Sequence, residues 1–70
     1  MHEYNINIRQ PTGKILHKKI MSRFEITSEM IVRSQMCWYS TGTVFEVNGK
    51  AFRKIHVDDD VKGYAELEEV

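Results

Sequence analysis

The residues from Asp58 to Glu69 carry acidic side chains at a spacing that could hold calcium. With Asp58 as position 1, carboxylates fall at positions 1, 3, 9 and 12 and glycine at position 6, as in the calcium loop of an EF-hand. Position 5, however, is Lys62, a cation where an oxygen ligand is required. The flanking segments 53–57 and 65–70 are typical of strands, whereas an EF-hand needs two helices. We therefore predict an acidic turn between strands and no metal site.

The other residue types that could do chemistry are scattered along the chain. The histidines, at His2, His17 and His56, have no Cys, His or Asp partner at ligand spacing. Cys37 is the single cysteine and has no neighbouring base to activate it, so we expect a buried core thiol. The four glycines stand in separate turns and form no phosphate-binding loop. The sequence therefore predicts no enzyme, no catalytic residue and no cofactor.

Basic and aromatic residues supply the candidate binding set. The members are Trp38, Tyr39, Lys18, Lys19, Arg23, Arg33, Arg53 and Lys54. Aromatic anchors are typical of protein interfaces, while cations interleaved with aromatic rings are typical of surfaces that bind nucleic acids. Trp38 would equally suit a position in the core, because it is the only tryptophan of a small domain.

The charges are unevenly distributed although they sum to zero. Residues 1–56 hold nine Lys or Arg and four Asp or Glu, whereas residues 57–70 hold one Lys and six acids. One interpretation is that the acidic end folds back and neutralises the basic body. The other is two faces of opposite sign, one of which meets a charged partner.

The length of the chain limits its stability. Seventy residues make one domain, 1–70, whose single core supplies roughly 3–5 kcal/mol of net stability. One cysteine allows no disulfide within the chain, so we expect good packing or self-association to stabilise it. Small secreted domains are usually rich in disulfides, and no signal-like or membrane-spanning apolar run is present, so we expect a cytoplasmic protein.

Two β-hairpins are predicted by the turn signals. Residues 4–8 alternate between apolar and polar side chains, and Pro11 with Gly13 then predicts a turn that joins strands 3–9 and 14–21. The second hairpin turns at Asn48-Gly49, the dipeptide most typical of a two-residue type I′ turn.

The register of the second hairpin has two interpretations. A two-residue loop would pair Phe45 with Phe52, while a three-residue loop with a bulge would pair Glu46 with Lys50. The strands of this hairpin carry apolar residues on both faces, which favours a bent strand pair within a small barrel.

Residues 28–36 have two interpretations as well. Thr27 could cap a helix there, and Ile26 could pack on Ile31, but the β-branched pair Ile31-Val32 slightly favours a strand. A last strand is expected over 64–70. The resulting fold class is mainly β, a small antiparallel barrel or strongly twisted sheet of five to six strands, similar in size to an SH3 domain, with at most one short helix near 28–36.

These observations lead to two functional hypotheses. The first is a small non-enzymatic protein-interaction module, a regulator, accessory protein or subunit of an assembly, whose partner is another protein or a second copy of the chain. The alternative is a small β-barrel that binds nucleic acids through its basic residues and exposed aromatics. No membrane partner and no small-molecule cofactor is expected.

Overall fold

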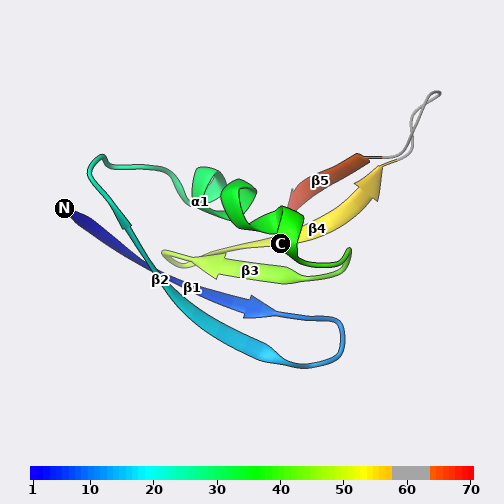
Figure 1. Ribbon diagram of the computed structural model, residues 1–70. Helices are drawn as coiled ribbons and strands as arrows, with labels where there is room; N and C mark the ends of the chain where they lie inside the picture. The colour runs from blue at the N-terminus through cyan, green and yellow to red at the C-terminus, as the bar shows by residue number, and fades with distance from the viewer. Residues whose placement is uncertain (58–63) are drawn as a thin grey trace.

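A computed structural model describes residues 1–57 and 64–70 of the chain, which form one open antiparallel sheet with a helix on one face (Figure 1). The strands lie in the order β2-β1-β3-β4-β5. The elements, in chain order, are β1 (His2–Arg9), β2 (Ile15–Ser22), α1 (Ser28–Gln35), the 3-10 turn η1 (Met36–Trp38), β3 (Val44–Val47), β4 (Lys50–Val57) and β5 (Tyr64–Glu69). The chain therefore forms a hairpin, crosses the sheet through α1, and adds three further strands on the other side of β1.

The first hairpin forms as its alternating pattern predicts. In β1 the side chains of Tyr4, Ile6 and Ile8 are buried against the helix, and the residues between them are exposed. The turn closes with a hydrogen bond from Gln10 N to Lys14 O at 2.8 Å. Gly13 has a φ of 93°, a value that residues with a Cβ atom rarely adopt.

The second hairpin has the two-residue loop, and the alternative with a bulge is wrong. Phe45 pairs with Phe52 and Val47 with Lys50. Asn48 and Gly49 have φ values of 54° and 79°, as a type I′ turn requires at both central positions. The twist of this turn matches the twist of the strands, so β3 and β4 pair directly from the loop onward.

Residues 28–35 form a helix, so the slight preference for a strand is wrong. The side chain of Thr27 accepts a hydrogen bond from Met30 N at 3.2 Å and caps the first turn. The β-branched pair Ile31-Val32 lies fully within the core, where packing against the sheet outweighs its strand propensity. Burial of one helical face therefore decides the local structure.

The core lies between α1 and one face of the sheet. Its members come from every element except β2 and β5: Tyr4, Ile6, Ile8, Ile31, Val32, Met36, Phe45, Val47 and Phe52. Leu16 and Ile20 of β2 and Leu67 of β5 are half-buried against its margins. The two outer strands are consequently the least covered parts of the sheet.

The mainly β prediction of five antiparallel strands with one short helix is confirmed, but the sheet is open, so the barrel among the two predicted forms does not occur. The apolar residues on the second face of the central hairpin, Val44 and Ile55, are only half-buried and lie opposite the helix. A barrel would need β2 to pair with β5, but these strands stand at opposite margins of the five-stranded sheet. The helix supplies the apolar cover that closure of the sheet would otherwise provide.

The described acidic strand, β5, does not cover the basic strand β2. Strand β5 pairs with β4, three strands away from β2. The predicted acidic turn at Asp58–Asp60, with Lys62 of the calcium pattern, lies outside the described residues. Neither helix among the described residues has the length and apolar character needed to cross a membrane.

Candidate functional site

Strand β2 presents free backbone groups at the margin of the sheet. In an antiparallel pair, alternate residues direct their N–H and C=O groups toward the partner strand. The bond from Gln10 N to Lys14 O and the register of β1 with β2 assign the even-numbered residues of β2 to β1. The odd-numbered residues therefore direct their backbone groups away from the sheet; they are Ile15, His17, Lys19 and Met21. We call β2 with these outward groups the free edge.

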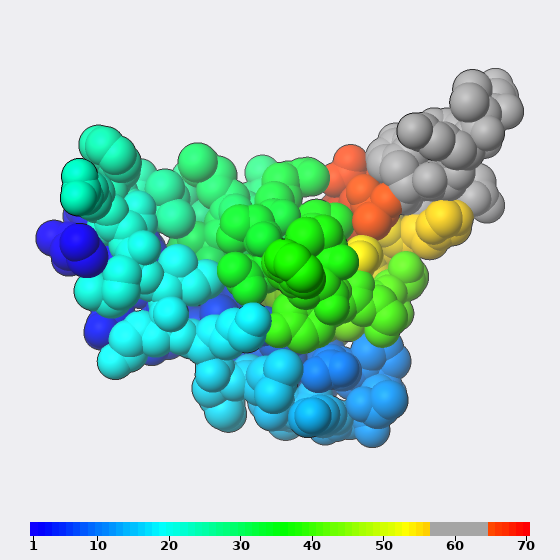
Figure 2. Space-filling view, viewed as in Figure 1, coloured from blue at the N-terminus to red at the C-terminus, as the bar shows by residue number. Residues whose placement is uncertain are grey.

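Figure 2 shows the free edge (cyan) lying uncovered beneath α1 and η1 (green). Ile15 and Met21 are each 51% exposed, and the side chains of His17 and Lys19 are exposed between them. Sequence reasoning missed Ile15, His17 and Met21 as candidates. Their alternation along a strand was visible, but strand order decides which strand lies at an edge.

At the opposite edge, β5, a side chain of the strand itself accepts one of the outward N–H groups. Leu67 N donates to Oε1 of Glu66 at 3.1 Å, and Arg33 of α1 donates to the same carboxylate oxygen at 2.7 Å. The hydrogen bond from Arg33, with that from Leu67 N, lowers the pKa of Glu66 below its usual value of 4.5. The Glu66 carboxylate raises the pKa of Arg33 in turn. One outward N–H of β5 is thus already satisfied, so this edge has one donor fewer for pairing with a further strand.

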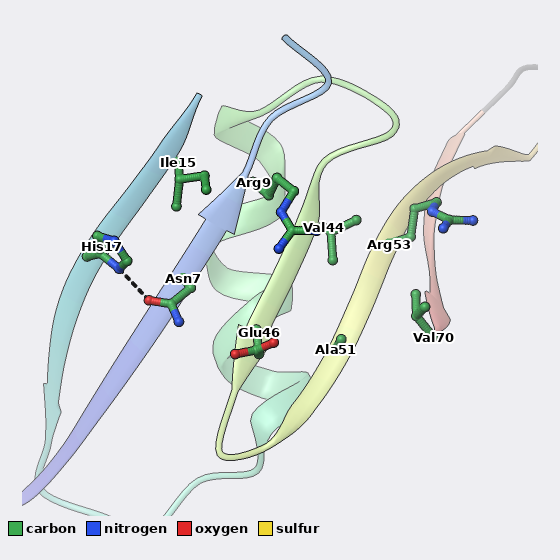
Figure 3. A pocket seen from close by; sticks show the side chains of 9 residues that line it. All are labelled: Asn7, Arg9, Ile15, His17, Val44, Glu46, Ala51, Arg53 and Val70. Atoms are coloured by element: carbon green, nitrogen blue, oxygen red, sulfur yellow. Dashed lines mark hydrogen bonds between the residues drawn. The ribbon is translucent and has the colours of Figure 1, made fainter. Parts of the chain in front are cut away.

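The face of the sheet opposite α1 holds a shallow depression of about 360 Å³ (Figure 3). Its lining comes from all five strands or their ends: Asn7, Arg9, Ile15, His17, Val44, Glu46, Ala51, Arg53 and Val70. We call this surface the open face. Ile15 and His17 belong to both the open face and the free edge.

The polar groups of the open face do not form a catalytic arrangement. His17 Nδ1 donates to Oδ1 of Asn7 at 2.5 Å, so its partner is an amide and not a nucleophile or a carboxylate (Figure 3). No serine, threonine or cysteine is among the lining residues. Arg9 has no ion-pair partner within the described part of the chain. The open face thus offers hydrogen-bonding and charged groups around small apolar residues, as a binding surface does.

No metal centre forms within residues 1–57 and 64–70, where no three His, Cys, Asp or Glu side chains gather. The three histidines lie on three different strands, β1, β2 and β4. Cys37 is exposed in η1, so the prediction of a buried core thiol is wrong. The 3-10 turn directs Met36 into the core in its place.

Part of the predicted binding set lies together beside the free edge. Trp38 in η1 is 75% exposed, and the half-buried Tyr39 follows it with its ring against Phe45 at 5.7 Å between centroids. The ammonium group of Lys18 lies 5.5 Å from the centre of the Tyr39 ring, and it donates to Gln35 at 3.5 Å. Lys19, on the opposite side of β2, pairs with Glu3 at 3.3 Å. Lys18 and Lys19 thus point to opposite sides of β2, and Tyr39 contacts the strand on the side of Lys18.

The remaining members of the predicted set lie elsewhere, and most have structural partners. Arg33 pairs with Glu29 as well as Glu66. Arg53 pairs with Glu68 at 3.5 Å across β4 and β5.

Lys54 is half-buried, and its Nζ donates to the backbone oxygens of Met36 and Tyr39 at 2.8 and 2.6 Å. It therefore satisfies the carbonyls that end α1 and η1. Arg23 is exposed in the loop after β2.

The fold and the site define a class of protein: a small, mainly β open sheet with one short helix and with the free edge at β2. In comparisons with known proteins, no family model, no curated protein and no solved structure matches the chain.

Proposed function

We propose that this chain is a small non-enzymatic protein-interaction module that binds its partner by strand addition at β2. In strand addition an extended segment of the partner pairs with an exposed edge, and main-chain hydrogen bonds give the affinity. The single observation that carries the proposal is the contrast between the two edges. The eight-residue β2 offers four residues with outward backbone groups, while on β5 Glu66, which is held by Arg33, already accepts the outward N–H of Leu67.

The surroundings of β2 support this role. Natural proteins usually protect a long edge strand with proline, a bulge or a covering loop. No proline interrupts β2, and all eight of its residues pair with β1 in continuous register. Two lysines discourage unselective pairing without obstructing the strand. The exposed thiol of Cys37 suits a reducing compartment, so we place the protein in the cytoplasm.

Nucleic-acid binding is the second candidate function, and one observation favours it. Lys18, Lys19 and Arg23 lie on or next to one strand, and Trp38 and Phe24 are 75% and 76% exposed. Salt bridges or backbone bonds already occupy Arg33, Arg53 and Lys54, which leaves a small basic surface. Fluorescence of Trp38 in a titration with single-stranded oligonucleotides at low salt would detect such binding, which should weaken steeply as salt is added.

Substitution of Lys19 by proline tests strand addition directly. The N–H of Lys19 points away from β1, so proline there removes an outward donor and no hydrogen bond within the sheet. Lys19→Ala is the matched control, because it removes the same ammonium group and keeps the N–H. We expect a native partner captured from cell lysate by the unmodified chain to be retained by Lys19→Ala and lost by Lys19→Pro.

Circular dichroism would establish that both variants are folded. Capture of the same partner by Lys19→Pro with unchanged affinity would contradict binding at the free edge.

A further inference from the structure

We infer that the segment accepted by β2 is an acidic extended segment of a second protein, an inference that rests on the proposed strand addition. The basic residues of β2 point to opposite sides of the strand. Lys18 lies on the helix side and Lys19 on the open face, as their contacts with Tyr39 and Glu3 show. A strand beside β2 would thus meet one ammonium group on each of its faces.

Among the described residues, no carboxylate pairs with the charge of Lys18. Its hydrogen bond is to the neutral amide of Gln35, and its other contact is the Tyr39 ring. Lys14, just before the strand, and Arg23, just after it, have no ion pair with any described residue. Carboxylates on an incoming strand would provide the opposite charges, and cross-strand pairs of opposite charge stabilise a sheet.

A second copy of this chain fits the free edge less well than an acidic segment of another protein does. Pairing of two β2 strands about Lys18 would set this residue opposite its own copy, and like charges directly opposite each other destabilise a sheet. The acidic strand β5 of another copy has the required charge, but its outward N–H at Leu67 already donates to Glu66. The chain therefore disfavours both routes to edge pairing with itself.

The register of an antiparallel addition specifies the segment. Two residues of the incoming segment would lie on the open face, one opposite Met21 and one, six positions later, opposite Ile15. Apolar side chains at these two positions would cover the half-exposed side chains of Met21 and Ile15. The residues opposite Lys19 and Lys18 are adjacent and face opposite sides. The segment is therefore apolar at its first and seventh positions and acidic at its third and fourth.

A peptide built to this pattern tests the inference. The probe is a capped seven-residue peptide with valine at both ends, glutamate at the third and fourth positions and threonine elsewhere; the control peptide carries lysine in place of glutamate. In an NMR titration of the full chain at low salt, we expect the glutamate peptide to shift the amide signals of His17, Lys19 and Met21. We expect it to bind about tenfold more tightly than the lysine peptide.

Variants of the chain test whether the preference for the glutamate peptide depends on Lys18 and Lys19. Lys18→Glu combined with Lys19→Glu should reverse the preference between the two peptides, whereas Lys50→Glu, a charge reversal at the distant β3–β4 turn, should leave it unchanged. Lys19→Pro should abolish binding of both peptides.

Four results would overturn the inference. Equal binding of both peptides at these amides would refute the acidic partner and leave strand addition standing. Absence of any shift along β2, or insensitivity to Lys19→Pro, would refute both proposals. Concentration-dependent shifts of the same amides in the free chain would identify a second copy as the occupant.

Discussion

At the scale of single residues, the environments of two side chains could not be predicted from the sequence. Thr43, just before β3, is fully buried, and its hydroxyl has no hydrogen-bond partner among the described residues. The carboxylate of Glu66 accepts two hydrogen bonds at once, from Arg33 and from Leu67 N at the margin of the sheet. The buried hydroxyl of Thr43 lowers the stability of the fold, because a buried polar group without a partner loses its hydration. The carboxylate of Glu66 instead protects the edge of the sheet at β5.

Thr43→Val should stabilise the protein by about 1 kcal/mol, because valine keeps the shape of threonine and removes the unpartnered hydroxyl. Urea unfolding followed by circular dichroism measures the free energy of unfolding. Thr41→Val, at an exposed position in the preceding turn, is the matched control. A loss of stability in Thr43→Val would show that the hydroxyl has a partner.

Glu66 should make stability depend on pH in acid. Its pKa is lowered in the folded state, mainly by the hydrogen bond from Arg33, so its contribution is present above its usual pKa of 4.5 and is lost as the pH falls through the lower folded value. We expect Glu66→Gln to lower the melting temperature at neutral pH and to have little effect at about pH 3. An equal effect at both pH values would refute a charge-dependent cap.

At the scale of elements, α1 depends on its cap and its buried face together. Eight residues are too few for a stable isolated helix, so the helix forms because Ile31 and Val32 pack on the sheet. Thr27 sets where it begins, and Lys54 satisfies carbonyls where α1 and η1 end. The helix is therefore secured by three different segments of the chain.

Thr27→Ala should destabilise the protein by about 1 kcal/mol, since Met30 N loses its acceptor. Thr41→Ala, which changes an exposed threonine outside the helix, should alter the free energy of unfolding by less than about 0.5 kcal/mol. Denaturant unfolding of both variants gives the comparison. Equal effects would mean that the cap contributes nothing.

At the scale of the whole molecule, one layer of core residues supports the sheet. Phe45 is fully buried in the central strand β3, opposite Phe52 and against the edge of the Tyr39 ring. A domain of this size has roughly 3–5 kcal/mol of net stability, so the loss of one large core side chain can remove most of it.

Phe45→Ala should cost about 3–5 kcal/mol and leave most of the chain unfolded at room temperature. Phe24→Ala removes the same side chain from a position that is 76% exposed and should cost less than about 0.5 kcal/mol. Near- and far-ultraviolet circular dichroism distinguishes the two outcomes. A folded, cooperative Phe45→Ala variant would show that the core has another centre.

The candidate site could be predicted from the sequence only in part. The pattern around Trp38, Tyr39, Lys18 and Lys19 marked residues that the fold gathers beside β2. The same reasoning included Arg33, Arg53 and Lys54, which the fold assigns to ion pairs or backbone bonds. Residue type alone does not distinguish a free cation from a paired one, because the partners lie far apart in the chain.

The sequence by itself determined the two hairpins, because their turns need residues that adopt positive φ and their strands alternate at period 2. Only the tertiary structure decided the rest. Packing against the sheet made 28–35 a helix, and the order of the strands left β2 free at one edge with the acidic β5 at the other. Strand order depends on contacts between distant segments, and no local pattern carries that information.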